Sequence, residues 1–186
     1  MKINILFSLV VVAIIAILLG VGLFKPQPVM IDNQLKTNLR LTVKNLTPAG
    51  TILPLYTCDG KNFSPPLELS GVPAAAQTLA LTVIDPDAPT GQFVHWLMWN
   101  IEPQTKQIVE DTLPMGVTVG TGSTGRVGYV GPCPSEGTHH YVFKLLALDI
   151  KLDLPVSTTL TEFNTAAAGH IIATAEVIST YTRQPK

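Results

Sequence analysis

The chain has 186 residues, and removing the apolar segment Met1–Phe24 leaves 186 − 24 = 162, the size of one ordinary domain. Lysine and arginine total 12, aspartate and glutamate 13, and Lys2 is the only charge in the removed segment, so the remainder carries 11 − 13 = −2. This charge excludes a nucleic-acid-binding protein that relies on bulk positive charge. Because 46% of residues are hydrophobic and only 13% charged, the chain is not a disordered protein, and its 15 prolines and 14 glycines predict strands and turns rather than a helical bundle.

An uncharged segment near the N-terminus, Ile3–Phe24, is long enough to cross a membrane. As a helix it would span about 33 Å, against a hydrocarbon core of about 30 Å. A cleaved signal peptide usually has a shorter apolar stretch and a small-x-small cleavage site, and the residues around Phe24 offer no good one. Residues 1–24 are therefore predicted to form one N-terminal transmembrane helix that anchors an exported domain, with secretion after signal cleavage as the alternative.

Two cysteines, Cys58 and Cys133, agree with export, because an even number suits one disulfide in an oxidising compartment. The alternative is two buried free thiols in a cytoplasmic domain. Residues 25–35 hold two prolines and no clear periodicity, which is typical of a linker. We therefore expect a membrane-tethered domain, residues 36–186, on the periplasmic or extracytoplasmic side.

Short apolar or alternating segments bounded by proline, glycine and aspartate predict the strands of a mainly β domain. The four clearest segments are Leu39–Val43, Leu79–Ile84, Val94–Ile101 and Tyr141–Leu148. The last three are too apolar for strands with one face in water, so we expect them in the core.

The C-terminal part contains one predicted helix. Thr159–Ala168 begins with a capping box, in which Thr159 precedes Glu162 by three residues, and Gly169 follows at the position where glycine commonly ends a helix. The next segment, His170–Tyr181, fits either a second helix or a final strand. Its β-prone end favours the strand.

Two aspartates lie in a rigid turn directly after a predicted core strand. The prolines of Asp85-Pro86-Asp87-Ala88-Pro89 restrict the backbone and hold the carboxylates in place. Each carboxylate could serve a binding site or could accept backbone N–H groups within its own turn. For Asp85 both interpretations are equally good, and for Asp87 the turn is favoured.

Three histidines lie on predicted strands. Strict alternation places His95 on the same strand face as Leu97 and Trp99, where it is expected to be half-buried. A single histidine at such a position is more often a core residue than a ligand. The same alternation sends His139 and His140 to opposite faces, with Tyr141 on the side of His139. Only one histidine of this pair is therefore expected to share a pocket with Tyr141.

Motifs spread over about residues 40–183 together resemble the phosphatidylethanolamine-binding protein (PEBP) family, in its bacterial Raf kinase inhibitor-like branch. The matching pieces are Tyr56-Thr57-Cys58-Asp59-Gly60, Ser64-Pro65-Pro66, Asp85-Pro86-Asp87-Ala88-Pro89, Gly91, His95-Trp96, Asn100-Ile101, Gly128-Tyr129, Gly131-Pro132-Cys133-Pro134, Gly137-Thr138-His139-His140-Tyr141, Phe143, Ala147-Leu148-Asp149, Gly169-His170, Tyr181 and Arg183. The resemblance implies two antiparallel sheets, a PEBP-like β-sandwich with Greek-key connections, and a small helix near the C-terminus.

The resemblance also implies a small pocket for a phosphate-like anion. Carried over residue by residue, its ligand-binding residues are Asp85, His95, Gly131, His139 and Tyr141, and its rim is formed by Asp59, Pro132 and Pro134. The sequence departs from the family at two places. The usual arginine is replaced by His140, which is too short to brace Asp85 or Asp87 as an arginine could, and the usual Asn-Asp is absent from residues 120–126.

An anion requires hydrogen-bond donors, so His95 and His139 are expected to act as paired donors. Asp85 supplies only negative charge, and it would instead orient an imidazole or meet the ammonium group of an ethanolamine head group. Backbone donors are expected at Gly131 and Cys133, because the two prolines of this loop have none.

These observations favour a non-enzymatic binding module without a cofactor. Its expected partners are a phosphate-type anion or phospholipid head group, the membrane through the N-terminal helix and a still unidentified protein, with no nucleic acid. One alternative is a zinc-dependent hydrolase using His95, His139 and Asp85. Another is a thiol enzyme with Cys58 or Cys133 as nucleophile. Since both cysteines lie in loops beside the same pocket, we predict that they form a disulfide in the exported protein.

Overall fold

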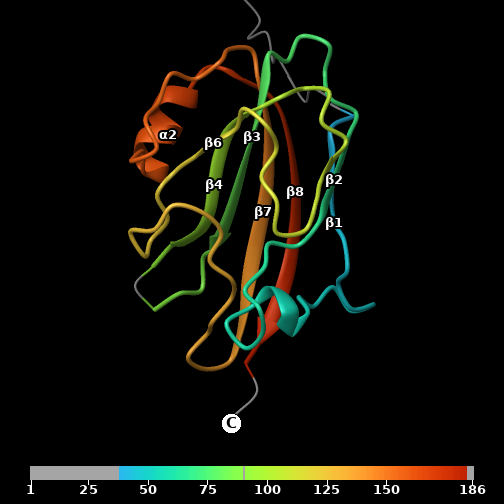
Figure 1. Ribbon diagram of the computed structural model, residues 1–186, viewed down its shortest axis with the longest axis vertical. Helices are drawn as coiled ribbons and strands as arrows, with labels where there is room; N and C mark the ends of the chain where they lie inside the picture. The colour runs from blue at the N-terminus through green and yellow to red at the C-terminus, as the bar shows by residue number, and fades with distance from the viewer. Residues whose placement is uncertain (1–37, 90, 184–186) are drawn as a thin grey trace, which may run out of the picture. The chain divides into compact units, whose positions relative to one another are not determined.

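Two antiparallel β-sheets form the scaffold in the computed structural model, which describes residues 38–89 and 91–183 (Figure 1). The smaller sheet has the order β1 (Arg40–Val43), β2 (Leu67–Ser70), β5 (Gln107–Ile108). The larger sheet has the order β6 (Thr118–Val119), β4 (Phe93–Ile101), β3 (Thr78–Asp85), β7 (Thr138–Leu148), β8 (Ile171–Thr182). The prediction of a mainly β domain with two antiparallel sheets is confirmed, and each of the four predicted strand segments overlaps an observed strand.

The predicted transmembrane helix, residues 1–24, and the predicted linker, residues 25–35, lie outside the described residues. Between residues 38 and 183, position 90 excepted, no helix is both long enough and apolar enough to span a bilayer. The anchor, the linker and the domain boundary at residue 36 therefore stay predictions.

The strands β3 and β4 of the five-stranded sheet are buried almost throughout, which explains why they are almost continuously apolar. One face packs against the three-stranded sheet, where Leu81 of β3 meets Leu69 of β2 in a common core. The other face packs against the helix α2 (Leu160–Ala167), where Ala80 and Leu146 meet Phe163. Figure 1 shows these three layers, with α2 and the small sheet on opposite sides of the large one. Side chains that alternate along a strand thus enter two different cores.

Helix α2 begins as the sequence predicts. Thr159 is the N-cap residue, its side chain accepts the backbone N–H of Glu162, and the Glu162 carboxylate accepts the backbone N–H of Thr159 at 2.8 Å. After Gly169 at φ +81°, the chain continues as the strand β8 rather than as a second helix. The preference for a strand in this segment is confirmed.

We expect Thr159→Ala to lower the free energy of unfolding by about 1 kcal/mol, because it removes one side of the capping box. Urea unfolding of the variant and the parent chain measures this difference. Thr161→Ala is the matched control, since Thr161 is an exposed threonine of the same helix outside the box, and its effect should be close to zero. Equal losses in the two variants would contradict the capping role.

A β-bulge in β4 overturns the predicted position of His95. The pairing of β4 with β3 shifts by one residue at His95, which is left without a directly opposite partner. The extra residue places Val94, rather than His95, in the core of Leu97 and Trp99. The ring of His95 instead lies 5.2 Å from that of Tyr141, and His95 is buried rather than half-buried. A bulge changes the face to which a side chain points, because it interrupts the alternation of side chains between the two faces of the strand.

Candidate functional site

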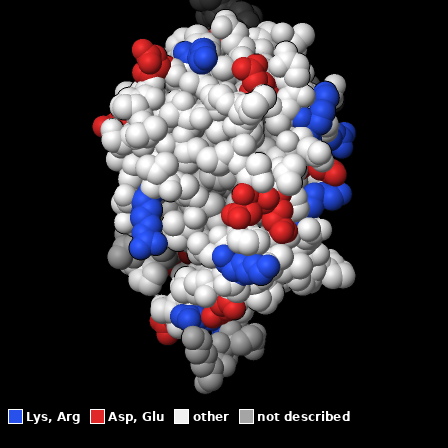
Figure 2. Space-filling model, viewed as in Figure 1, with Lys and Arg blue, Asp and Glu red and all other residues white. Residues whose placement is uncertain are grey.

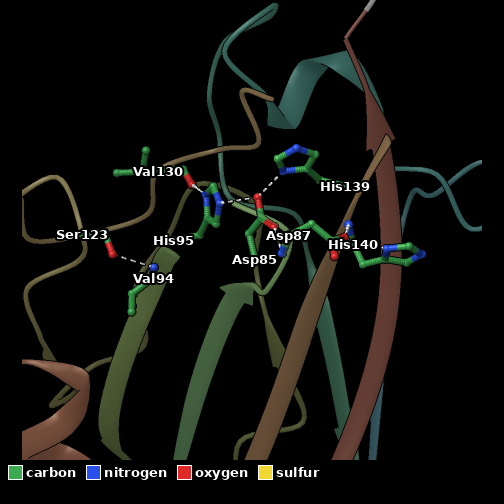
Figure 3. A network of polar contacts seen from close by, with 8 residues as sticks. All are labelled: Asp85, Asp87, Val94, His95, Ser123, Val130, His139 and His140. Carbon is green, nitrogen blue, oxygen red and sulfur yellow. Dashed lines mark hydrogen bonds and ion pairs between the residues drawn. The ribbon is translucent and has the colours of Figure 1, made fainter. Parts of the chain in front are cut away.

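The site is organised around the buried carboxylate of Asp85 at the end of β3. Its Oδ1 accepts the backbone N–H of Asp87 at 2.8 Å, so the carboxylate closes its own turn. Its Oδ2 lies 2.7 Å from Nδ1 of His139 and 4.0 Å from Nε2 of His95. Figure 3 shows the two imidazole rings approaching Asp85 from different sides. Asp85 therefore accepts a backbone N–H within its own turn and also pairs with His139, and its part in ligand binding stays a prediction.

The ring of His95 is held as a neutral tautomer. Its Nδ1 lies 2.5 Å from the backbone oxygen of Val130, and a carbonyl oxygen only accepts, so Nδ1 carries the proton and donates it. Burial lowers the pKa of His95 below its usual range, more strongly than the Asp85 charge opposes this. In the neutral ring Nε2 carries a lone pair, and no described residue donates to it. The two paired histidine donors stay a prediction, and in its neutral form His95 offers an acceptor instead.

His139 provides the complementary group. The Asp85 carboxylate can only accept a hydrogen bond from Nδ1 of His139, so Nδ1 carries a proton and Nε2 remains available to a further partner. An N–H at Nε2 would let the ring donate to an anion. His139 is only 8% exposed, so this donor would act in a largely desolvated place.

A cavity of about 330 Å³ opens beside these three residues. Of the predicted site residues, Asp85, His95, Gly131, His139 and Pro134 line it. Its other lining residues are Ala88, Pro89, Phe93, Thr124, Val130, Cys133 and Ser135. Phe93 was not among the predicted site residues, yet its ring lies 4.6 Å from that of His95. Its position two residues before His95 on the same strand could have indicated that it lies near the site.

Three other predicted residues are not among those that line the cavity, and their part in binding stays a prediction. Tyr141 is fully buried, and burial and the Asp85 charge raise the pKa of its phenol. Asp59 accepts hydrogen bonds from the Tyr181 hydroxyl at 2.9 Å and from Nε of Arg183 at 3.1 Å. The carbonyl oxygen of Pro132 accepts the backbone N–H of Cys58 at 3.1 Å.

Gly131 matters for the cavity wall because it lacks a side chain, and its backbone N–H does not act as a hydrogen-bond donor to a ligand. Its N–H donates to Oδ1 of Asn62 at 2.7 Å and is not free for a ligand, which corrects the expectation of a backbone donor at this position. A Cβ atom added to Gly131 would lie 2.4 Å from the backbone oxygen of Tyr56. Only glycine therefore allows these two loops to approach so closely.

His140 points away from the cavity, as alternation predicts, and it is exposed. Its backbone N–H and its Nδ1 lie 2.8 and 2.7 Å from Oδ2 of Asp87. These hydrogen bonds lower the pKa of Asp87. Two predictions are corrected here: a histidine is long enough to reach Asp87, and the backbone N–H that Asp87 accepts comes from β7 rather than from its own turn.

The predicted disulfide is present between Cys58 and Cys133, whose Cα atoms lie 5.4 Å apart. Neither residue carries a free thiol, and a thiol-enzyme mechanism therefore has no nucleophile in this oxidised state. Within residues 38–89 and 91–183, no three His, Cys, Asp or Glu side chains are grouped so that they could hold a metal ion. Without such a group among the described residues, the geometry lends the zinc alternative no support.

Lowering the pH should destabilise the fold partly through His95. Burial lowers the pKa of His95 in the folded state, so the unfolded chain takes up this proton first when the pH falls through about 6.5. The stabilisation is therefore present above that pH and is lost below it. Urea unfolding from mildly alkaline to mildly acidic pH should show a steeper loss for the parent chain than for His95→Gln, which cannot titrate. Parallel curves would contradict this prediction.

Comparison with known proteins agrees with this architecture. The sequence model of the family "Phosphatidylethanolamine-binding protein" matches residues 42–182. A UPF0098 protein of Methanothermobacter thermautotrophicus is 42% identical over 139 residues, covering 72% of this chain and 92% of that protein. A UPF0098 protein of Pyrococcus abyssi is 41% identical over 138 residues, covering 69% and 77%.

Two solved structures are similar along nearly their whole length. A putative PEBP homolog from Chlamydia trachomatis has a TM-score of 0.76 and 35% identity, and the match covers 80% of this chain and 99% of that one. YbcL of Escherichia coli, described as a member of the mammalian PEBP family, has a TM-score of 0.73 and 30% identity, with 78% and 99% covered. With the match over residues 42–182 and the identity to its relatives, the chain belongs to the phosphatidylethanolamine-binding protein family.

Proposed function

We propose that the domain is a non-enzymatic binding module for a phosphate monoester, either free or as a phospholipid head group. The observation that carries the proposal is the ion pair of Asp85 and His139 beside the cavity of about 330 Å³. This volume lies at the lower end of the range usual for ligand pockets, which is about 300–1,000 Å³. When His139 is protonated, its free N–H faces a ligand oxygen with a full positive charge.

The acceptor at His95 adds selectivity. A fully ionised anion has no hydrogen to offer Nε2, whereas a phosphate P–OH or an ammonium group has one. One donor at His139 and one acceptor at His95 therefore suit a ligand that carries both charges, such as phosphoethanolamine. The apolar wall formed by Phe93, Val130 and Pro134 suits the carbon atoms of such a ligand.

The location of the domain is part of the proposal. An anchor at residues 1–24 and a linker at residues 25–35 would hold it near the outer surface of a membrane, where head groups are available. The disulfide supports an oxidising compartment. Cell fractionation with intact-mass measurement tests this: we expect the full-length mass in the membrane fraction. A shortened mass in the soluble fraction would mean that the segment is cleaved.

Calorimetric titration of the full chain in detergent with phosphoethanolamine tests the binding function. We expect saturable binding to the parent chain and a large loss of affinity in His139→Ala, because this variant lacks the ring that donates to the ligand. Ethanolamine without the phosphate should bind far more weakly. Unchanged affinity in His139→Ala would remove His139 as the donor, and an absence of saturable binding would refute the proposal.

Two further measurements separate the sources of the ligand and the class of function. Inorganic phosphate and vesicles containing phosphatidylethanolamine replace phosphoethanolamine in parallel titrations, and preference for the vesicles would identify the lipid. Release of inorganic phosphate from phosphoethanolamine is followed on long incubation. No release above the buffer rate is expected, and release that disappears in His139→Ala would show an enzyme instead.

A further inference from the structure

The last strand of the large sheet, β8, forms a long sheet edge. It has 12 residues, whereas the other strands at sheet edges, β1, β5 and β6, have four, two and two. Figure 1 shows β8 beyond β7, the strand with which it pairs. Proteins protect sheet edges from pairing with other chains by short edge strands, by prolines and by lysines. β8 is long and contains neither residue type, so it lacks these protections.

The direction of the backbone groups along β8 follows from one residue near its end. The carbonyl oxygen of Thr180 accepts the N–H of Ile52 at 2.8 Å, and the N–H of Thr180 donates to the oxygen of Gly50 at 3.4 Å. Both backbone groups of Thr180 therefore point away from β7. β7 and β8 pair without a register shift between residues 173 and 182, so every second residue before Thr180 points its backbone groups the same way.

Three exposed residues therefore carry outward backbone groups to which no described residue is hydrogen-bonded. They are Thr174, Glu176 and Ile178. The segment that binds Thr180 closes the edge at that point, so the free part of the edge covers residues 171–179. Alternating donors and acceptors of this kind fit the edge of another β-strand.

We propose that this free edge pairs with the same edge of a second copy of this chain, in antiparallel orientation about a twofold axis. A pair that uses the whole free part places residue 171 of one copy opposite residue 179 of the other. Ala175 then lies opposite its own counterpart, and Thr174 lies opposite Glu176. Thr174 and Glu176 both have outward backbone groups, so they exchange two hydrogen bonds, and the twofold axis repeats them.

The two ends of the free edge fit this register. In the second copy the chain enters β8 from Gly169, whose φ of +81° turns it out of the strand direction. It therefore leaves the pair before it reaches the segment bound to Thr180 of the first copy. A register shifted toward the closed end would drive the second strand into that segment. The cavity residue His139 pairs with Tyr181, beyond the closed end, so this pairing does not involve the ligand site.

The side chains along the edge also suit a second copy. Ile171 and Ile178 are 43% and 57% exposed, and antiparallel pairing brings each close to the other in the second copy, which removes apolar surface from water. Glu176, the only charged residue of β8, lies opposite Thr174 instead of opposite the second glutamate, and Lys144 lies 3.9 Å from its carboxylate. The chain has a formal net charge of −1, and acidic and basic side chains are interspersed on the face drawn in Figure 2, so long-range repulsion between copies is weak.

Cysteine cross-linking of the full chain in detergent tests the register. The backbone groups of Ala175 point toward β7, so the two copies of this residue form a non-hydrogen-bonded pair with Cα atoms about 4.5 Å apart, within disulfide range. On mild oxidation we expect Ala175→Cys to give a disulfide-linked dimer, and peptide mass mapping to identify the bond between the two new cysteines. Ile178→Cys is the control, because its two copies lie roughly 20 Å apart and should not cross-link.

Analytical ultracentrifugation in density-matched detergent measures the association itself. We expect a monomer–dimer equilibrium for the parent chain. Thr174→Pro removes an outward N–H from each copy and should raise the dissociation constant about tenfold or more, while an edge strand tolerates a proline whose N–H would face outward. Thr174→Ala keeps this N–H and is the matched control, with an unchanged dissociation constant.

Distinct results would overturn the proposal. These are an Ala175→Cys variant that stays monomeric, equal cross-linking of Ala175→Cys and Ile178→Cys, and a parent chain that sediments as a monomer at high concentration. A dimer of unchanged affinity in folded Thr174→Pro would be held by another surface. If Thr174→Pro does not fold, the cross-linking result decides. Outward amides that resist hydrogen exchange in a monomer would show that residues 1–37 of the same chain cover the edge instead.

Discussion

Replacing both Cys58 and Cys133 by serine should lower the free energy of unfolding by about 4 kcal/mol. The disulfide joins residues 75 positions apart, and closing a loop of this length restricts the unfolded chain by about that amount in the chain-entropy description. Urea unfolding followed by tryptophan fluorescence measures the difference. The reduced parent chain should unfold at the same urea concentration as the double variant, and a loss below about 1 kcal/mol would contradict the prediction.

The same variant should keep its ligand-binding site. Besides the disulfide, three hydrogen bonds join the two loops: Cys58 N–H to the Pro132 oxygen, Gly131 N–H to Asn62 Oδ1 and the Tyr129 hydroxyl to the Tyr56 oxygen. These contacts persist when the sulfurs are removed. Phosphoethanolamine should therefore bind the folded double variant with nearly unchanged affinity, and its loss would mean that the disulfide itself positions the cavity wall.

His139→Arg should abolish phosphoethanolamine binding, whereas His140→Arg should leave it intact. At residue 139 an arginine must enter the cavity beside Asp85, where its guanidinium pairs with the carboxylate and occupies the ligand's place. At residue 140 the side chain is exposed and faces Asp87 outside the cavity. An arginine there can make the same ion pair, so its effect on stability should be neutral or slightly favourable.

Calorimetry at mildly acidic pH, with unfolding curves of both variants, tests this pair of substitutions. The comparison is matched because the two variants introduce the same side chain at adjacent positions. If both lose binding while remaining folded, the register of β7 with its neighbours is wrong. If both retain binding, the ligand does not occupy the cavity beside His139.

Local signals in the sequence were sufficient for most of the scaffold. The capping box at Thr159 and Glu162 depends only on residues three positions apart, so it marks the start of α2 without further information. Alternation from Tyr141 onward separates His139 from His140 correctly, because β7 pairs regularly with both neighbours over this part. The family motifs also predicted that Asp85 and His139 belong to one site. The hydrogen bond between their side chains agrees with this prediction.

The sequence by itself therefore determined the β-rich class, the helix, the partner of each cysteine and the faces of His139 and His140. Only the tertiary structure decided the position of His95, because a bulge depends on how β4 pairs with β3 and leaves no local pattern. The donor and acceptor nitrogens of His95 were decided by a carbonyl 35 residues away, at Val130.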